Sequence, residues 1–231
     1  MQHDVVHGPS HALLRVNLDP GEQVITEAGA MVTYSDGMKM EAKLNAGQKA
    51  GCMAVLAAIF IAFVRKLVGG DSFFVSHFTA PAAGGSVTLA PSLNGSIDHR
   101  RLGAGEKLML TAGAYLASTP GLGLQMRWGG CSAIFSKEGA FFVEAEGPGE
   151  LWFNSYGGIH AIDVDGTYMV DNGHIVAFDP SLTFTIKRAG KGLMGSMASG
   201  EGLVCQFAGK GKVYIQSRNV GALVSWLAKI S

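Results

Sequence analysis

The chain has 231 residues, enough to bury a hydrophobic core without disulfides. Hydrophobic residues make up 48% and charged residues only 16%, against about 25% charged in typical soluble domains, which excludes intrinsic disorder. The 18 basic and 18 acidic residues cancel, so no global positive field favours nucleic acid. The 33 glycines follow no collagen-like period; they indicate many tight turns and favour an all-β fold.

The N-terminal residues 1–12 contain three histidines, an acid and a proline, where a secretory signal peptide would have an apolar segment. His3, His7 and His11 are spaced four apart, as metal ligands on one helix face would be, but a Gly-Pro pair interrupts such a helix. We therefore expect a mobile terminus without a metal site. The odd number of cysteines, three, is typical of a reducing compartment, and we expect a cytoplasmic protein.

Residues 12–100 form the first of three predicted β-repeats. An insertion at 44–70 contains the one long apolar run of the chain, Gly51–Val64, which Arg65 and Lys66 follow. These 14 uncharged residues are fewer than the roughly 20 that a membrane-spanning helix needs. Three elements of this repeat can be recognised again further along the chain: Leu18–Val32, Ser72–Val75 and Gly85–Pro91.

The same three elements recur, in the same order, in residues 101–162 and 163–218. Their copies are Leu102–Leu116 and Val164–Val176, then Ala140–Val143 and Gly202–Cys205, then Gly149–Ser155 and Gly211–Ser217. Ordered recurrence of this kind predicts tandem repeats, and the short apolar segments between glycines predict β-strands. We expect Gly29, Gly113 and Gly173 to occupy equivalent turns. A sandwich, a barrel and a stack of double-stranded β-helical units all fit this pattern.

Residues 219–231 are predicted to form a short C-terminal helix. Asn219 is a suitable N-cap residue. Four apolar residues fall on one face of this helix: Val220, Leu223, Val224 and Leu227. We expect this face to cover an open end of a sheet.

Charge is distributed unevenly along the chain. Residues 138–186 contain eight acids and no Lys or Arg, whereas residues 187–231 contain seven basic residues and one acid. Neighbouring faces of the repeats could carry complementary solvated charge. Alternatively, an acidic face of one subunit could meet a basic face of the next, in a head-to-tail contact.

Seven segments carry a family resemblance: Pro20-Gly-Glu22, Glu27-Ala-Gly-Ala-Met31, Gly69-Gly-Asp-Ser-Phe-Phe74, Leu116-Ala-Ser118, Gly147-Pro-Gly149, Ser155-Tyr-Gly157 and Val170-Asp-Asn-Gly-His-Ile-Val-Ala-Phe178. Together they resemble the mitochondrial biogenesis family called altered inheritance of mitochondria twenty-four, and its bacterial relatives. That family is similar in fold to the tryptophan RNA-binding attenuation protein, a short double-stranded β-helix that assembles into rings. The resemblance implies one compact unit of three tandem β-repeats of this type with pseudo-threefold symmetry. It also implies a homo-oligomer, with a trimer preferred, and no particular activity.

Each predicted repeat has a loop before its Phe-Phe-Val-type strand: residues 44–70, 127–139 and 188–202. All three loops mix glycine with large apolar side chains. Buried loops of this kind would belong to the core, whereas exposed ones would form an apolar patch for a lipid or protein partner. We expect interaction contacts, carried by Phe60, Phe63, Arg65, Lys66, Trp128, Phe135 and Met194.

Catalytic and cofactor motifs are missing from the sequence. It contains no His-x-His pair, no Gly-x-Ser-x-Gly and no P-loop, so we expect no enzyme activity, cofactor or metal. Asp163 and Asp165 would share one strand face, but a solvated turn explains them equally well. We therefore expect a non-catalytic structural or interaction protein, peripheral at a membrane through the apolar loop. The alternative is an RNA-binding ring-type module, which the zero net charge and the lack of a basic stripe disfavour.

Overall fold

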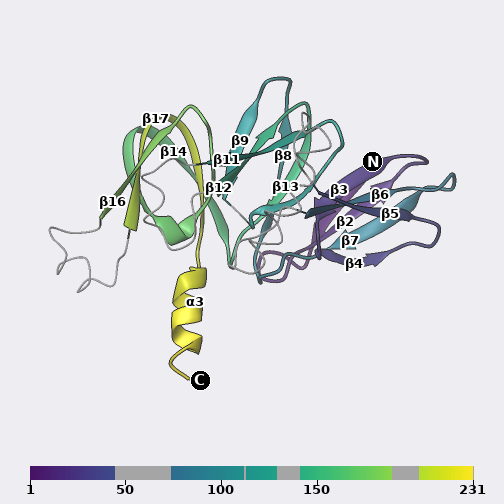
Figure 1. Ribbon diagram of the computed structural model, residues 1–231, viewed down its shortest axis with the longest axis horizontal. Coiled ribbons are helices and arrows are strands. Elements are labelled where there is room, and N and C mark those ends of the chain that lie inside the picture. Colours follow the sequence, from purple (N-terminus) through teal and green to yellow (C-terminus); the bar gives the residue numbers. More distant parts are fainter. Residues whose placement is uncertain (45–73, 112, 129–140, 189–202, 231) are drawn as a thin grey trace.

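The computed structural model describes residues 1–44, 74–111, 113–128, 141–188 and 203–230. These residues form seventeen β-strands, a single 3-10 turn and a single α-helix, α3 (Val220–Leu227), so the predicted all-β fold with a short C-terminal helix is confirmed. Figure 1 shows the strands in three groups that follow one another along the long axis of the molecule, in chain order.

We call these groups the first, second and third units. The first unit comprises β2 (Leu13–Leu18), β3 (Gln23–Glu27), β4 (Met31–Tyr34), β5 (Lys39–Leu44), β6 (Phe74–Thr79) and β7 (Gly85–Leu89). The second comprises β8 (Ile97–Leu102), β9 (Lys107–Thr111), β10 (Tyr115–Ser118), β11 (Gly123–Trp128), β12 (Phe141–Glu146) and β13 (Gly149–Asn154). The third comprises β14 (Ile159–Asp171), the 3-10 turn η2 (Asn172–His174), β15 (Ile175–Phe178), β16 (Thr183–Arg188) and β17 (Leu203–Gln216). The predicted boundaries after residues 100 and 162 lie inside β8 and β14.

The N-terminus is a strand, β1 (Gln2–Val6), which pairs antiparallel with β2. The prediction of a mobile terminus was therefore wrong. The N-terminal amino group also lies 2.9 Å from the Asp19 carboxylate and 2.7 Å from that of Glu22. Backbone pairing over five residues and these two contacts fix a segment whose composition resembles a loop.

Three antiparallel sheets run through the molecule, and two of them cross from one unit to the next. The strand orders are β1-β2-β7-β4, β5-β6-β3-β10-β13-β8 and β11-β12-β9-β15-β17-β14, with β16 also paired to β17. The pair β3–β10 joins the first unit to the second, and the pair β9–β15 joins the second to the third. Strand hydrogen bonds therefore link the units directly.

The register is the same in both of these junctions. Ala117 lies opposite Thr26 in the first junction, and Ala177 lies opposite Leu110 in the second. Within the units, β4, β10 and β15 pair with β7, β13 and β17, and each of the three short strands has a register shift after its first residue. Such a bulge bends the strand locally and increases its twist.

Each junction also completes a hydrophobic core. The core of the first unit contains Leu14, Val24 and Phe78 together with three buried residues of the second unit: Leu116, Ala117 and Trp152. The core of the second unit likewise contains three buried residues of the third: Val176, Ala177 and Tyr214. Among the described residues, the buried core of the third unit consists only of its own side chains, from Val164 to Val213.

The glycines predicted to occupy equivalent turns do so in two units. Gly29 and Gly113 have φ of 92° and 83°, the left-handed region that favours glycine, and each lies in a turn before β4 or β10. Gly173 lies instead in η2. There, a Cβ atom would collide with the side-chain amide of Asn219. The glycine in the third unit thus allows close packing against Asn219 and does not serve a left-handed backbone.

Candidate interaction surfaces

Six of the seven predicted interaction residues lie outside the described residues: Phe60, Phe63, Arg65, Lys66, Phe135 and Met194. The seventh, Trp128, ends β11, where its backbone lies opposite Phe141; its side chain is also outside the description. The strands that flank the three loops are described. Each loop joins two paired strands, which meet at Leu44 and Phe74, at Trp128 and Phe141, and at Arg188 and Leu203. The three loops therefore connect the same kind of strand pair.

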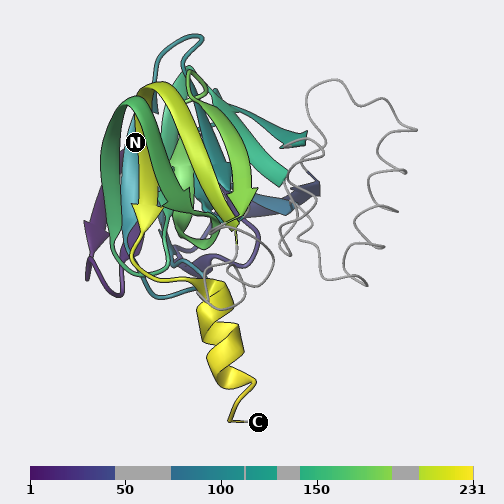
Figure 2. The same cartoon turned by 90° about the vertical axis from the view of Figure 1, so that its left-hand side faces the viewer.

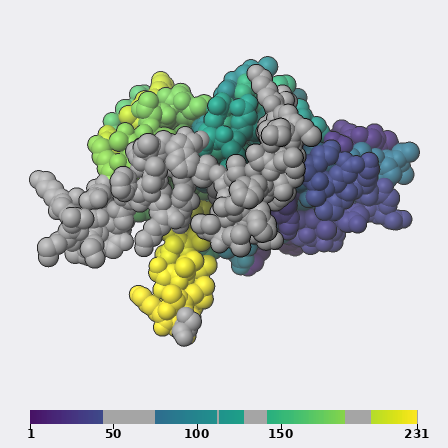
Figure 3. Space-filling model, in the orientation of Figure 1, coloured from purple at the N-terminus to yellow at the C-terminus, as the bar shows by residue number. Residues whose placement is uncertain are grey.

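The helix α3 is an exposed apolar surface. Asn219 caps it as predicted, because its side chain accepts a hydrogen bond of 3.2 Å from the Ala222 amide. The helix contains no buried residue, and Figures 2 and 3 show it projecting away from the sheets. The expectation that it covers an open end of a sheet was therefore wrong. In the described structure, the capped helix extends beyond the strands instead of packing on them.

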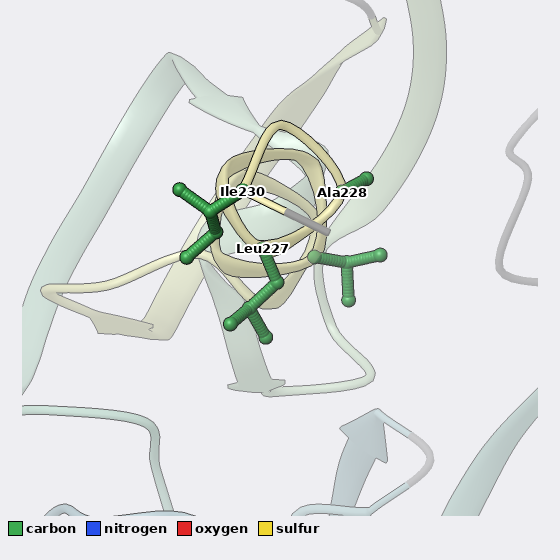
Figure 4. A pocket seen from close by; sticks show the side chains of 4 residues that line it. Leu227, Ala228 and Ile230 are labelled. Carbon is green, nitrogen blue, oxygen red and sulfur yellow. The ribbon is translucent and has the colours of Figure 1, made fainter.

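The α3 surface, as we call it, consists of Val224, Trp226, Leu227, Ala228 and Ile230. Trp226 is 59% exposed and Ile230 is 66% exposed. Val224, Leu227, Ala228 and Ile230 line a shallow hollow with apolar walls, and Figure 4 shows Leu227 and Ile230 pointing outward from the helix. Exposed large apolar side chains in such a cluster are typical of a contact surface.

Two strand edges form a second kind of surface. The β4 edge is the side of Met31–Tyr34 that faces away from β7, and the β14 edge is the side of residues 166–171 that faces away from β17. In the described part of the chain, no strand pairs with either edge. All four residues of β4 are exposed, whereas all four of β10 and all four of β15 are buried.

Most of the charged groups that could serve chemistry are paired with one another. The carboxylate of Glu144 lies 2.8 Å from Arg127 and 3.1 Å from Lys107. The hydrogen bond from Arg127 lowers the pKa of Glu144, and the hydrogen bond from Lys107 lowers it further. Burial acts in the opposite direction and raises this pKa, but its effect is smaller than that of Arg127. Lys107 also contacts Glu146 at 3.0 Å. This cluster holds β9, β11 and β12 together and leaves its carboxylate ionised, which suits a structural ion pair.

The uneven charge distribution is compensated inside the third unit. Lys212 lies 2.7 Å from Asp163, and Lys210 lies 3.8 Å from Asp165, across the paired strands β14 and β17. The acidic and basic stretches of the sequence are thus partly cross-strand neighbours. These two aspartates meet lysines rather than each other, so they form no acid–base pair.

Histidines gather at one place, where β1 approaches β8. The rings of His3 and His99 are 4.3 Å apart, and His99 stacks on the buried Trp152 at 5.3 Å. His99 Nε2 is 2.7 Å from Glu150, which also contacts Arg101 at 3.4 Å. Burial, then the neighbouring His99, lowers the pKa of His3. Within the described ranges, no three His, Cys, Asp or Glu side chains are placed to hold a metal ion.

The described cysteine, Cys205, is buried in the core of the third unit. Burial raises the pKa of its thiol to about 11, so the sulfur stays protonated at neutral pH. Such a thiol is a poor nucleophile.

No helix in the described residues is long and apolar enough to cross a bilayer.

Comparisons with known proteins agree with this all-β architecture. The X-ray crystal structure of a protein from Streptococcus pyogenes superposes with a TM-score of 0.78 and 29% identity, covering 100% of this chain and 99% of that one. An uncharacterized protein of Streptococcus pyogenes serotype M6 is 34% identical over 211 residues, which are 90% of this chain and 82% of that protein. The family model described as Mitochondrial biogenesis AIM24 matches residues 3–218. The chain therefore belongs to the Mitochondrial biogenesis AIM24 family, as the sequence motifs predicted.

Proposed function

We propose that the protein is a non-catalytic, self-associating interaction protein that lies peripherally at a membrane through the apolar loop at 44–70. One observation carries this proposal: the described surface exposes apolar side chains on α3 and along the β4 and β14 edges, while most of its charged side chains pair with one another. An apolar surface of this kind needs a partner, whereas a catalytic site needs unpaired titratable groups.

The proposal includes the predicted repeat architecture. We infer three equivalent repeats of double-stranded β-helical type, because the junctions β3–β10 and β9–β15 have the same register and the units share the same bulge. A closed pseudo-threefold arrangement would also need a junction between the third unit and the first. Three copies are the oligomer that the family resemblance favours.

RNA binding has less support. Lys210 and Lys212 face aspartates, and Arg100 lies 3.3 Å from Asp179 and 3.1 Å from the hydroxyl of Tyr214. Phosphate binding would have to break these contacts.

Co-sedimentation with vesicles tests the membrane part of the proposal. We expect the wild-type protein to sediment with phosphatidylcholine vesicles that contain phosphatidylglycerol, because Arg65 and Lys66 could reach anionic headgroups while Phe60 and Phe63 enter the interface. The variant F60S/F63S should lose this binding and keep its oligomer mass. Dissociation of the oligomer would instead make the loop a subunit contact.

A matched variant on the other apolar surface makes the test specific. The double variant W226S/I230S removes the two most exposed large hydrophobic side chains of the α3 surface and leaves the sequence of the loop unchanged. If this variant loses vesicle binding and F60S/F63S keeps it, α3 is the lipid contact and the loop proposal is wrong. If the wild-type protein binds no vesicles, the membrane part of the proposal is wrong.

A further inference from the structure

The strand junction between units occurs twice in the described structure, and each of its halves occurs once more with no partner strand among the described residues. In each junction, the second strand of one unit pairs with the strand that follows Gly113 or Gly173 in the next unit: β3 with β10, and β9 with β15. The first unit has an equivalent strand, β4, and no described strand pairs with the side of β4 that faces away from β7. The third unit has residues 166–171 of β14, which occupy the position of β3 and β9 because they pair with the start of β17.

The exposure of equivalent residues shows what each free half lacks. The bulge places Val32 of β4 at the position of Leu116 in β10 and Val176 in β15. Leu116 and Val176 are 0% and 1% exposed, whereas Val32 is 49% exposed. Thr33 is likewise exposed, and its counterparts Ala117 and Ala177 are completely buried. β4 thus has the pairing and bulge of a junction strand without the neighbour that buries one.

At the opposite end of the molecule, β14 is exposed where its counterpart in the second unit is buried. Tyr168 and Met169 of β14 are 43% and 48% exposed. The corresponding residues of β9, which does pair across a junction, are Leu108 and Met109. Leu108 is completely buried and Met109 is half-buried. The core of the third unit also lacks, among the described residues, any buried side chain from a following unit.

We propose that the β4 edge of one copy pairs with the β14 edge of a second copy, so that copies join head to tail through the junction that already links their units. The register inside the chain fixes the expected register between copies. Thr33 would lie opposite Val170, as Ala117 lies opposite Thr26, and Tyr34 would lie opposite Met169, as Phe178 lies opposite Met109. Val32 would then enter the core of the third unit of the neighbouring copy.

The chemistry of the two edges fits this partner. The β4 edge contains no charged side chain, and the one charged residue of the β14 edge, Asp171, already accepts a hydrogen bond from the Gly173 amide and lies just beyond the proposed pairs, so those pairs would bury no unpaired charge. An unprotected edge strand with exposed apolar residues is a template for another strand. Figure 1 shows β4 and β14 at opposite ends of the molecule, so the two edges of one chain do not meet each other. A heterologous contact of this kind closes into a ring or extends as a filament.

Two charge variants test the inference, which rests on the self-association part of the proposed function. Val32→Lys places a cation on the β4 edge, and Met169→Lys places one on the β14 edge; both residues are about half exposed, so each chain should still fold. We expect each variant to sediment as a single chain under conditions where the wild-type protein is an oligomer. An equimolar mixture of the two should sediment at twice the mass of one chain, because each variant keeps the edge that the other has lost.

The possible outcomes separate this inference from the broader proposal. If both variants keep the wild-type mass, the copies associate elsewhere, and the edge pairing is wrong while self-association stands. If both become single chains but their mixture does not recombine, the contact is not head to tail. If the wild-type protein is itself a single chain at micromolar concentrations, both the inference and the self-association proposal are wrong.

A disulfide test checks the register independently of the charge variants. In a background with Cys52→Ser and Cys131→Ser, the single variants Tyr34→Cys and Met169→Cys are mixed and oxidised. Directly opposed residues of an antiparallel pair have Cα atoms about 4.5–5.5 Å apart, within the range of a disulfide. We expect a crosslinked dimer from this mixture and none from the control mixture of Thr33→Cys with Met169→Cys. The reverse result would refute the proposed register.

Discussion

Leu116 and Val32 provide a quantitative test of how the units complete one another, because they occupy the same bulge position in β10 and β4. Leu116 is completely buried in the core of the first unit, so Leu116→Ala should lower the free energy of unfolding by about 2–5 kcal/mol. Val32 is half exposed, so Val32→Ala should change the free energy of unfolding of the unassociated chain by no more than about 0.5 kcal/mol. Val87→Ala, at a buried valine of β7, is the matched control and should cost roughly 2 kcal/mol.

Urea unfolding, followed by circular dichroism at concentrations where the protein sediments as a single chain, measures these three values. A cost for Val32→Ala as large as that for Val87→Ala would mean that β4 is already covered within the chain, which would refute the assignment of a free edge. A cost below about 1 kcal/mol for Leu116→Ala would mean that this side chain does not complete the first core. At higher concentration, Val32→Ala should additionally weaken the oligomer.

Two further predictions concern titratable groups. Because Arg127 and Lys107 lower the pKa of Glu144, its stabilising effect is complete above about pH 4.5 and disappears as the pH falls through the lower folded-state pKa. Glu144→Gln should therefore reduce the free energy of unfolding by about 1–2 kcal/mol at pH 7. Urea titrations should show that the difference between variant and wild type becomes smaller towards pH 3. A difference that stays constant with pH would contradict the ion-pair explanation. Cys205 has a thiol pKa of about 11 and is buried, so a Cys52→Ser/Cys131→Ser variant should show no native thiol reactive with Ellman's reagent at pH 8 and one after denaturation. Rapid native labelling would show that the core of the third unit opens readily.

Local features of the fold were predictable from the sequence. Strands follow the short apolar segments, and α3 begins after Asn219 because the residue type and the following apolar spacing both mark a helix start. In the first unit, the Phe-Phe-Val element is displaced by one residue from its counterparts. Thr26 pairs with Ser76, not with Val75, where Leu110 pairs with Val143. A shift of one residue moves a side chain to the other face of a strand. The shift is not visible in the sequence, because the copies of this element consist of similar residues.

Features that depend on distant segments were not predictable. β1 forms because β2 offers it a partner, and the composition of residues 1–12 contains no strand pattern. The exposure of α3 and of β4 depends on which neighbours are present, while their apolar sequences resemble those of buried elements. Repetition in the sequence indicates how many units there are. It does not indicate which strand of one unit pairs with which strand of the next.

The sharing of cores between units has a consequence for synthesis. Leu116 and Trp152 leave the ribosome only after the first unit has been translated, so the core of that unit remains incomplete until the second arrives. A chain that stopped after β7 would expose the apolar surface that these residues cover and would be a substrate for chaperones. The first and second units are thus each completed by the unit that follows, and neither has a complete core of its own.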